Sequence, residues 1–296
     1  MRQTKRCGAM QIQRCRGAAR RLRFGGHVSN APHVAWLKHA KQFQTAGGAT
    51  VDVWEFNHLP DPAVLSAWAA HFRNHYCLDT DLPLLVAGTG MTKAQFLINV
   101  KFPSRTDAPG PSVRSGDFAE ILVADFIEYV LGYWCPRLRY LDRWNPNDST
   151  KGTDVIAFLF ESQAGPEPED KLFLVESKGA LTGGPVNRLQ DAITDSIKDE
   201  EREATSLNAI KQRLIASGRH NDAMRVQRFQ NESDQPFVRR SAAAAVLDSG
   251  AYDEAVLAAA DISAHPNAGN LELIVIRGDD LMPLVRALYE RAANEA

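Results

Sequence analysis

Two apolar stretches, GTDVIAF at residues 152–158 and LFLVESK at residues 172–178, decide the fold that we expect for this chain. Both are runs of Val, Ile, Leu and Phe interrupted only by charges, a pattern typical of β-strands buried on both faces. Side chains alternate along a strand, so Glu176 and Lys178 point to one face and Ser177 points to the other. If the strand that starts at Asp154 pairs beside them, two carboxylates and one ammonium group converge on one patch.

That patch has the composition of a site for metal-dependent cleavage of a phosphodiester. Mg²⁺ prefers carboxylate and carbonyl oxygens and keeps several water molecules. It lowers the pKa of a bound water and neutralises charge on a phosphate, while a nearby lysine orients that water. A surface ion pair is the common alternative for Glu-x-Lys on one strand face. The apolar flanks argue against it here, because a lone buried charge is costly.

The elements around these two stretches follow a regular order. The sequence predicts a first helix with Ser115 as its N-cap, a short strand before the Asp154 strand, and a long helix after the Glu176 strand. The predicted ranges are a helix over 115–133, a strand near 138–141, the two strands above, helices over 185–216, 219–230 and 252–260, a strand over 271–277 and a helix over 281–293. Reduced to its core, this is an αβββαβ arrangement of helices packed on a buried sheet.

This order resembles the PD-(D/E)XK nuclease superfamily, in which an acid begins the second strand and an acid-x-Lys triplet lies on the third. More narrowly, residues 116–178, LQDAI at 189–193, LNAIK at 207–211 and LIVIRG at 273–278 resemble the HamA nuclease subunit of Hachiman anti-phage defence systems. The likeness covers about residues 110–296. It implies a restriction-endonuclease-like α/β core with a mixed central sheet, and a superfamily 2 helicase, HamB-like, as the partner.

The resemblance also implies roles for single residues. Asp154 and Glu176 would ligate Mg²⁺, with Mn²⁺ as the alternative metal, and Lys178 would position or activate water. Glu120, on the first helix, matches the additional acid with which many members complete the metal site.

For Gln190 and Lys151, the sequence leaves two interpretations of the side chain's role open. Gln190 lies where some RecB-like members carry a Gln-xxx-Tyr helix motif, but Thr194 replaces the tyrosine, so Gln190 is either a supporting site residue or a helix-surface residue. Lys151 is either a phosphate contact or an exposed loop lysine. Along the long helix, Asp191, Asp195 and Asp199 recur every four residues, which predicts a solvated face.

Composition excludes several other classes of protein. No apolar run approaches the ~18 residues that a membrane span requires. The four cysteines have no Cys-x-x-Cys spacing, which favours a reducing cytoplasm over a disulfide framework or a zinc site. Zinc- or serine-based hydrolysis is not expected either, on the interpretation that the histidines lack zinc-type spacing and that no Gly-x-Ser-x-Gly elbow occurs. GTGMTK at 88–93 lacks the spacing of a phosphate-binding loop, so we expect no ATP binding by this chain.

The distribution of charge and of Pro- and Gly-rich segments divides the chain into three predicted parts. Residues 1–51 carry ten Lys and Arg and no Asp or Glu, so residues 1–49 are interpreted as a basic tail, a targeting segment or an early start codon. If the tail binds nucleic acid, it does so through phosphates. Residues 50–104 are predicted as a small α/β region, with strands over 50–56, 82–87 and 95–102 and a helix over 62–76. It either docks the partner or extends the sheet. Residues 110–296 are the nuclease domain.

The function that we expect is a cytoplasmic, Mg²⁺-dependent DNA endonuclease that works with a helicase. The acidic body argues against tight unaided binding of DNA, although the arginine-rich run 219–240 is predicted to supply a basic rim or a partner surface. One alternative is a non-catalytic module of the same fold that restrains a helicase or senses DNA ends. Another is a standalone repair or restriction nuclease.

Overall fold

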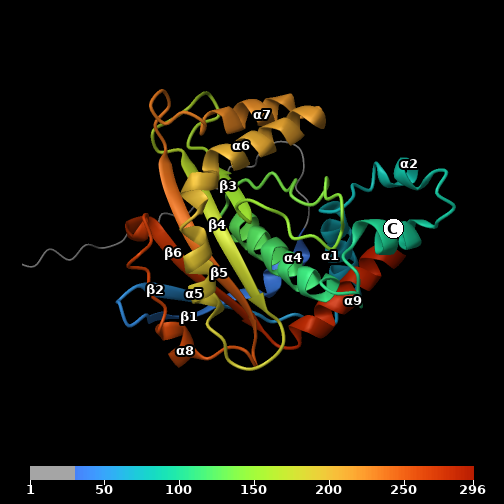
Figure 1. The fold of residues 1–296 in the computed structure, drawn as a ribbon, viewed down its shortest axis with the longest axis horizontal. Helices are drawn as coiled ribbons and strands as arrows, with labels where there is room; N and C mark the ends of the chain where they lie inside the picture. Colours follow the sequence, from blue (N-terminus) through green and yellow to red (C-terminus); the bar gives the residue numbers. More distant parts are fainter. Residues whose placement is uncertain (1–30) are drawn as a thin grey trace, which may run out of the picture.

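A six-stranded mixed sheet forms the centre of the computed structural model, which describes residues 31–296 (Figure 1). The strand order is β1-β2-β6-β5-β4-β3. The β1–β2 and β3–β4 pairs are antiparallel, whereas β2, β6, β5 and β4 run parallel to one another. The strands are β1 (Leu37–Gln44), β2 (Thr50–Phe56), β3 (Val155–Leu159), β4 (Lys171–Ala180), β5 (Val238–Asp248) and β6 (Leu271–Gly278).

Helices cover both faces of this sheet, and Figure 1 shows α4 and α5 crossing it while α6 and α7 lie together near β3. The α-helices are α1 (Pro62–Asn74), α2 (Leu82–Val86), α3 (Lys93–Phe96), α4 (Gly110–Asp125), α5 (Arg188–Ser196), α6 (Asp199–Ala216), α7 (His220–Gln227), α8 (Glu254–Ala258) and α9 (Leu281–Asn294). Short 3-10 turns are η1 (Pro32–Trp36) and η4 (Ala268–Asn270), and π-helical turns are η2 (Leu97–Lys101) and η3 (Phe126–Val130). Within residues 31–296, no helix combines the length and the apolar composition needed to cross a membrane.

Alternation along β5 separates two hydrophobic layers. Ala242, Ala244 and Val246 belong to the cluster under α4, α1 and α9. Ala243, Ala245 and Leu247 belong to the cluster under α5 and α8. Because successive strand residues face opposite sides, these two sets place helices on both faces of the sheet. The molecule is therefore a three-layer α/β/α arrangement.

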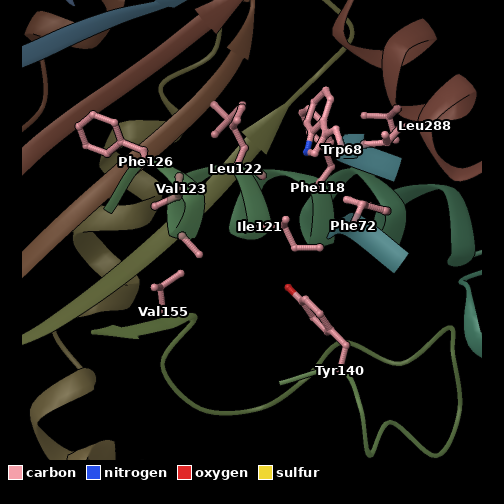
Figure 2. Packing of buried hydrophobic residues seen from close by; sticks show 14 of the residues in the cluster. Trp68, Phe72, Phe118, Ile121, Leu122, Val123, Phe126, Tyr140, Val155 and Leu288 are labelled. Atoms are coloured by element: carbon pink, nitrogen blue, oxygen red, sulfur yellow. The ribbon is translucent and has the colours of Figure 1, made fainter. Parts of the chain in front are cut away.

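The first layer is packed most densely around α4. Figure 2 shows Phe118 and Leu122 of α4 on the side of Trp68 and Leu288, while the hydroxyl of Tyr140 points toward α4 from the opposite side. Trp68 comes from α1 and Leu288 from α9, so segments from both ends of the described chain meet on one helix. Burial of such large side chains contributes about 1.5–3 kcal/mol each, which makes α4 a fixed support.

A glycine sets the distance between α4 and the sheet. A Cβ atom at Gly179 of β4 would lie 3.2 Å from Cβ of Ala119 and 3.3 Å from the carbonyl oxygen of Ser115. Both neighbours belong to α4. The missing side chain therefore allows α4 to lie close against β4, next to Glu120.

The N-terminal part of the chain differs from our prediction. η1 is a 3-10 turn and β1 is an edge strand of the main sheet, so a tail over residues 1–49 is wrong for residues 32–44, while residues 1–30 lie outside the described residues. The prediction counted Lys38 and Lys41 as part of a basic tail, but both are exposed residues of an edge strand, where lysine is common. In the region of residues 50–104, β2 pairs with β6 and α1 packs on α9, so this region extends the sheet.

Several predicted elements are also wrong in detail. Residues 82–87 and 95–102 are largely helical, with a capping box between Thr92 and Gln95. Residues 138–141 form no strand; only Trp134 bridges to Phe158. The long helix is split into α5 and α6 at residues 197–198. The alanine-rich β5 was not predicted at all, although it is the buried partner of β4.

A buried polar network ties η1 to α1 and α4. Nε2 of His33 lies 2.9 Å from Oδ2 of Asp125, and Nε2 of His71 lies 2.8 Å from Oδ1. Among residues 31–296, these three form the one group of His, Cys, Asp or Glu whose ligand atoms all lie within 4.8 Å of one another. His71 of α1 and His75, the C-cap residue of that helix, are also four residues apart, so our expectation that zinc-type histidine spacing is absent is wrong.

A protein cation already neutralises this network. Arg137 donates from Nη1 to Oδ1 of Asp125 at 2.6 Å, and from Nε to Glu128 at 2.6 Å. Three donors therefore converge on a carboxylate whose side chain is fully buried. We interpret the cluster as a hydrogen-bonded clamp that holds the start of the described chain.

Replacing Asp125 by alanine should lower the free energy of unfolding by about 3–5 kcal/mol, because Arg137 would lose a partner inside the protein. Urea denaturation checks this. The exposed Asp52, which pairs with His39, is the matched control, and its alanine variant should change stability by less than about 1 kcal/mol. Equal effects of the two variants would contradict the clamp.

Candidate active site

The candidate site lies in a notch at the edge of the sheet. β3 pairs with β4 only from Leu159–Lys171 to Val155–Val175, whereas β4 continues to Ala180. Beyond Val175, no described strand pairs with that side of β4. Asp154 takes the place of the missing strand, because its Oδ2 accepts the backbone N–H of Ser177 at 3.0 Å. The notch thereby leaves room for polar side chains between β4, α4 and α6.

Glu176 and Lys178 share one face of β4 and are in direct contact. Nζ of Lys178 donates to Oε1 of Glu176 at 2.6 Å and lies 2.8 Å from Oδ2 of Asp195 on α5. The Glu176 side chain is 5% exposed, and its Oε2 has no hydrogen-bond partner. Ser177 faces the other side and uses only its backbone at the site. The geometry agrees with the alternation read from the sequence.

An arginine that we did not predict joins the other two acids. Nε of Arg139 lies 2.9 Å from Oε2 of Glu120, and Nη2 donates to Oδ1 of Asp154 at 2.8 Å. The hydroxyl of Tyr140 donates to the same oxygen of Glu120. Arg139 lies in the irregular segment where we expected a strand, so no periodic pattern pointed to it.

A second arginine fixes that segment in place. Arg143 donates from Nη1 and Nη2 to both oxygens of Asp117 at 2.7 Å each. Asp117 is 3% exposed and lies on α4, one turn before Glu120. This bidentate pair holds the loop against the helix, which lets Arg139 reach Glu120 and Asp154.

The structure adds one buried carboxyl group to the predicted set. Asp199, the first residue of α6, is 3% exposed and accepts the hydroxyl of Thr153 at 2.9 Å through Oδ1, while Oδ2 has no partner. The solvated face predicted for the aspartates of residues 191–199 is therefore wrong for Asp199. We refer to the four carboxyl groups of Glu120, Asp154, Glu176 and Asp199 as the acid cluster.

Gln190 lies away from this cluster. Its amide accepts the backbone N–H of Asp261 at 2.7 Å and donates to the carbonyl of the same residue at 3.3 Å. It thus fixes the segment after α8 and does not line the cleft. Lys151, in contrast, is exposed at the cleft, so it keeps its interpretation as a phosphate contact.

An open cleft of about 1300 Å³ contains the predicted catalytic residues. Glu120, Asp154, Glu176 and Lys178 all line it, together with side chains from α5, α6 and α9. Residues from separate parts of the chain therefore meet at one solvent-accessible surface. A cleft of this size accommodates a segment of a polymer.

The match to known families agrees with this architecture. Residues 32–292 match the family model described as HamA. The chain belongs to the HamA family. The part that matches the HamA model begins before β1 and includes every residue of the acid cluster, so the N-terminal strands are part of the family's domain. No curated protein matches this HamA-family chain.

Burial raises the pKa of several carboxyl groups in this HamA-family site. Burial raises the pKa of Glu120 to about 8, with the charge of Asp154 adding to the effect and Arg139 opposing it. Burial also raises the pKa of Glu176 to about 8; Asp154 contributes again, and Lys178 opposes. For Asp199, burial raises the pKa to about 6. The charge of Asp154 therefore raises the pKa of both Glu120 and Glu176. The nearby cations do not offset this effect and that of burial.

Lys178 remains a cation. Burial disfavours its ammonium group, but hydrogen bonds to Asp195 and Glu176 outweigh burial and raise the pKa of Lys178 above its ordinary value. A lysine in this state donates hydrogen bonds and carries charge. It does not serve as a proton acceptor near neutral pH.

The raised pKa of Glu176 predicts that metal-free protein loses stability as pH rises. Between pH 4.5 and 8 the folded state binds protons that the unfolded chain has released, so the free energy of unfolding falls through this window. Urea denaturation in chelator from about pH 5 to about pH 8.5 should show a decrease of a few kcal/mol. Glu176→Gln, which cannot ionise, should make the decrease smaller, while Glu120 and Asp199 keep part of it. A profile that rises, or one that the variant leaves unchanged, would contradict this assignment.

Proposed function

We propose that this chain is a metal-dependent DNA nuclease of the PD-(D/E)XK type, and that it hydrolyses phosphodiesters as the effector subunit of a cytoplasmic Hachiman anti-phage defence complex. Membership of the HamA family supports the defence context and a helicase partner. One observation carries the chemistry. Asp154, Glu176 and Lys178 line one open cleft, and the ammonium group of Lys178 donates a hydrogen bond to the carboxylate of Glu176.

The acid cluster fits a divalent cation such as Mg²⁺ or Mn²⁺. Its donors are all oxygen atoms, which these hard cations prefer. Oε2 of Glu176 and Oδ2 of Asp199 are buried without a hydrogen-bond partner, a costly state that a cation would relieve. Fully ionised, the four carboxylates face the cations Arg139 and Lys178, and Lys178 also pairs with Asp195, so at least two negative charges remain for a divalent ion.

Water molecules would complete the coordination. Among the described residues, no three members of the acid cluster each place a carboxylate oxygen within 4.8 Å of the other two, so the side chains alone do not enclose an ion. Mg²⁺ ordinarily keeps several waters and takes only one or two carboxylates directly. Asp154 and Glu176 would hold it, with Glu120 and Asp199 acting directly or through water.

The chain's own residues supply the rest of the proposed mechanism. When bound, the metal lowers the pKa of a water and neutralises charge that develops on the phosphate. Lys178, held as a cation by Glu176 and Asp195, would donate to a phosphate oxygen or orient the attacking water. Arg139 keeps Glu120 and Asp154 oriented, and its charge opposes the rise that burial causes in the pKa of Glu120. The buried position of Glu176 limits competing hydration of its carboxylate.

Cleavage of plasmid DNA with Mg²⁺ tests the proposal, by the chain alone and with its helicase and ATP. Lys178→Ala should lower the rate by about 10²–10⁴-fold, because a positioned donor to the reacting groups is lost. Asp154→Ala and Glu176→Ala should abolish measurable cleavage. The matched control is the ion pair between Glu161 and Lys171, which lies outside the cleft near the other end of β4. Replacing both by alanine should leave the rate unchanged.

The pattern of outcomes separates three functions. Cleavage only in the assembled sample identifies a partner-gated nuclease, and cleavage by the chain alone identifies a standalone nuclease. A second candidate is the non-catalytic module, which the pairing of Arg139 with Glu120 and Asp154 favours, because a protein cation already balances those acids. Metal-independent DNA or helicase binding, with no cleavage in any sample, would support that module and overturn the nuclease.

Mg²⁺ binding should release protons near neutral pH. Glu120 and Glu176 have pKa values raised to about 8 in the metal-free chain, so the metal must displace protons from them. Calorimetric titration at about pH 7 in buffers of different ionisation enthalpy measures this release. The apparent affinity for Mg²⁺ should rise as pH increases toward 8. Binding without proton release would place the metal elsewhere.

A further inference from the structure

Most basic side chains of the described residues already have a partner. Those that make no hydrogen bond or ion pair with another described residue are Lys38, Lys93, Arg105, Lys151, Arg202 and Arg286. The last three line the cleft, as do Glu120, Asp154 and Glu176 of the acid cluster. Unpaired cations therefore gather at the one surface where a polyanion is expected.

The arginine-rich run of residues 219–240 does not provide such a surface. Arg239 pairs with Glu203 and Arg240 with Glu272, while Arg219 and Arg228 pair with aspartates. Arg225 stacks on Phe160 and contacts Asp222. Carboxylates thus balance these charges, so we do not assign the basic rim to this run.

The three unpaired cations of the cleft come from separate elements. Lys151 lies in the loop before β3, Arg202 on α6 and Arg286 on α9. They therefore approach the cleft from different walls. Lys151 and Arg286 are exposed, so both are free to reach a ligand. Arg188 also lines the cleft, but it is paired with Asp191.

The remaining lining suits a sugar–phosphate backbone. It is rich in hydroxyl groups and glycine, and no aromatic, histidine, asparagine or glutamine side chain is part of it. The lining hydroxyls besides Ser177 are Ser112, Ser115, Ser149, Thr150, Thr182, Thr205 and Ser206. Hydroxyls, backbone N–H groups, Arg and Lys are the usual partners of phosphate oxygens. Asn and Gln commonly read base edges, and aromatic rings stack unpaired bases.

We propose that Arg202 and Arg286, assisted by Lys151, hold the phosphate backbone of duplex DNA in this cleft without reading base sequence. This inference rests on the proposed function and deepens it by assigning the residues that bind the substrate and the form of substrate that they bind. Duplex DNA is favoured over a single strand because it presents phosphates from two strands to cations on separate walls. A single strand would find no aromatic platform in the cleft.

Fluorescence anisotropy with the full chain tests the proposal. Binding is measured in chelator, where no cleavage occurs, with two duplexes of unrelated sequence and the corresponding single strands at several salt concentrations. The variants are Arg202→Gln, Arg286→Gln and the double variant. Arg105→Gln is the matched control, because Arg105 is also exposed and unpaired but lies outside the cleft. Thermal unfolding verifies that each variant is folded.

Each single cleft variant should weaken duplex binding about 3- to 10-fold, equally for both sequences, and reduce the salt slope of log K by about 1, and the double variant should reduce it by about 2. Arg202→Lys should restore most of the slope because it keeps the charge. Equal losses in Arg105→Gln, a preference for single strands, or no duplex binding at low salt would overturn the inference. Failure of the nuclease is a separate result, because binding that depends on both arginines without cleavage in Mg²⁺ would remove only the chemistry.

Discussion

Several carboxyl groups buried at an open sheet edge impose the constraint on which the rest of the site depends. Water does not solvate them fully, so each needs a hydrogen bond, a cation or a proton. Asp154 takes the backbone N–H that β3 leaves unpaired, Arg139 bridges it to Glu120, and Lys178 holds Glu176. Burial raises the pKa values of Glu120 and Glu176, and the charges of Arg139 and Lys178 do not fully offset it.

The helix α4 transmits this constraint to the rest of the fold. Gly179 lets it approach β4, which brings Glu120 to the cleft, while five residues later Asp125 closes the buried clamp with His33 and His71. One helix therefore carries both a site residue and the anchor for the N-terminal strands. The family match, which begins at residue 32, includes both Glu120 and the residues of the buried clamp.

Much of the fold was accessible from periodicity alone. The apolar runs around Asp154 and Glu176 predicted β3 and β4, and the strand over 271–277 and the closing helix are where we expected them. β5 was missed because a run of alanines has the local propensity of a helix, and only its burial between β4 and β6 makes it a strand. Residues 82–102 failed for the converse reason, since short apolar runs do not separate strand from helix.

The sequence by itself determined the alternation that puts Glu176 and Lys178 on one face, because that depends only on the two-residue period of a strand. It also placed Asp154 at the start of the preceding strand. Only the tertiary structure brought in Arg139 and Asp199, which lie on an irregular loop and at the start of α6. Their positions follow from loop anchoring and helix packing, which are long-range contacts that no local pattern encodes. The same holds for Arg202 and Arg286, since a cation is left without a partner only by what the folded chain places around it.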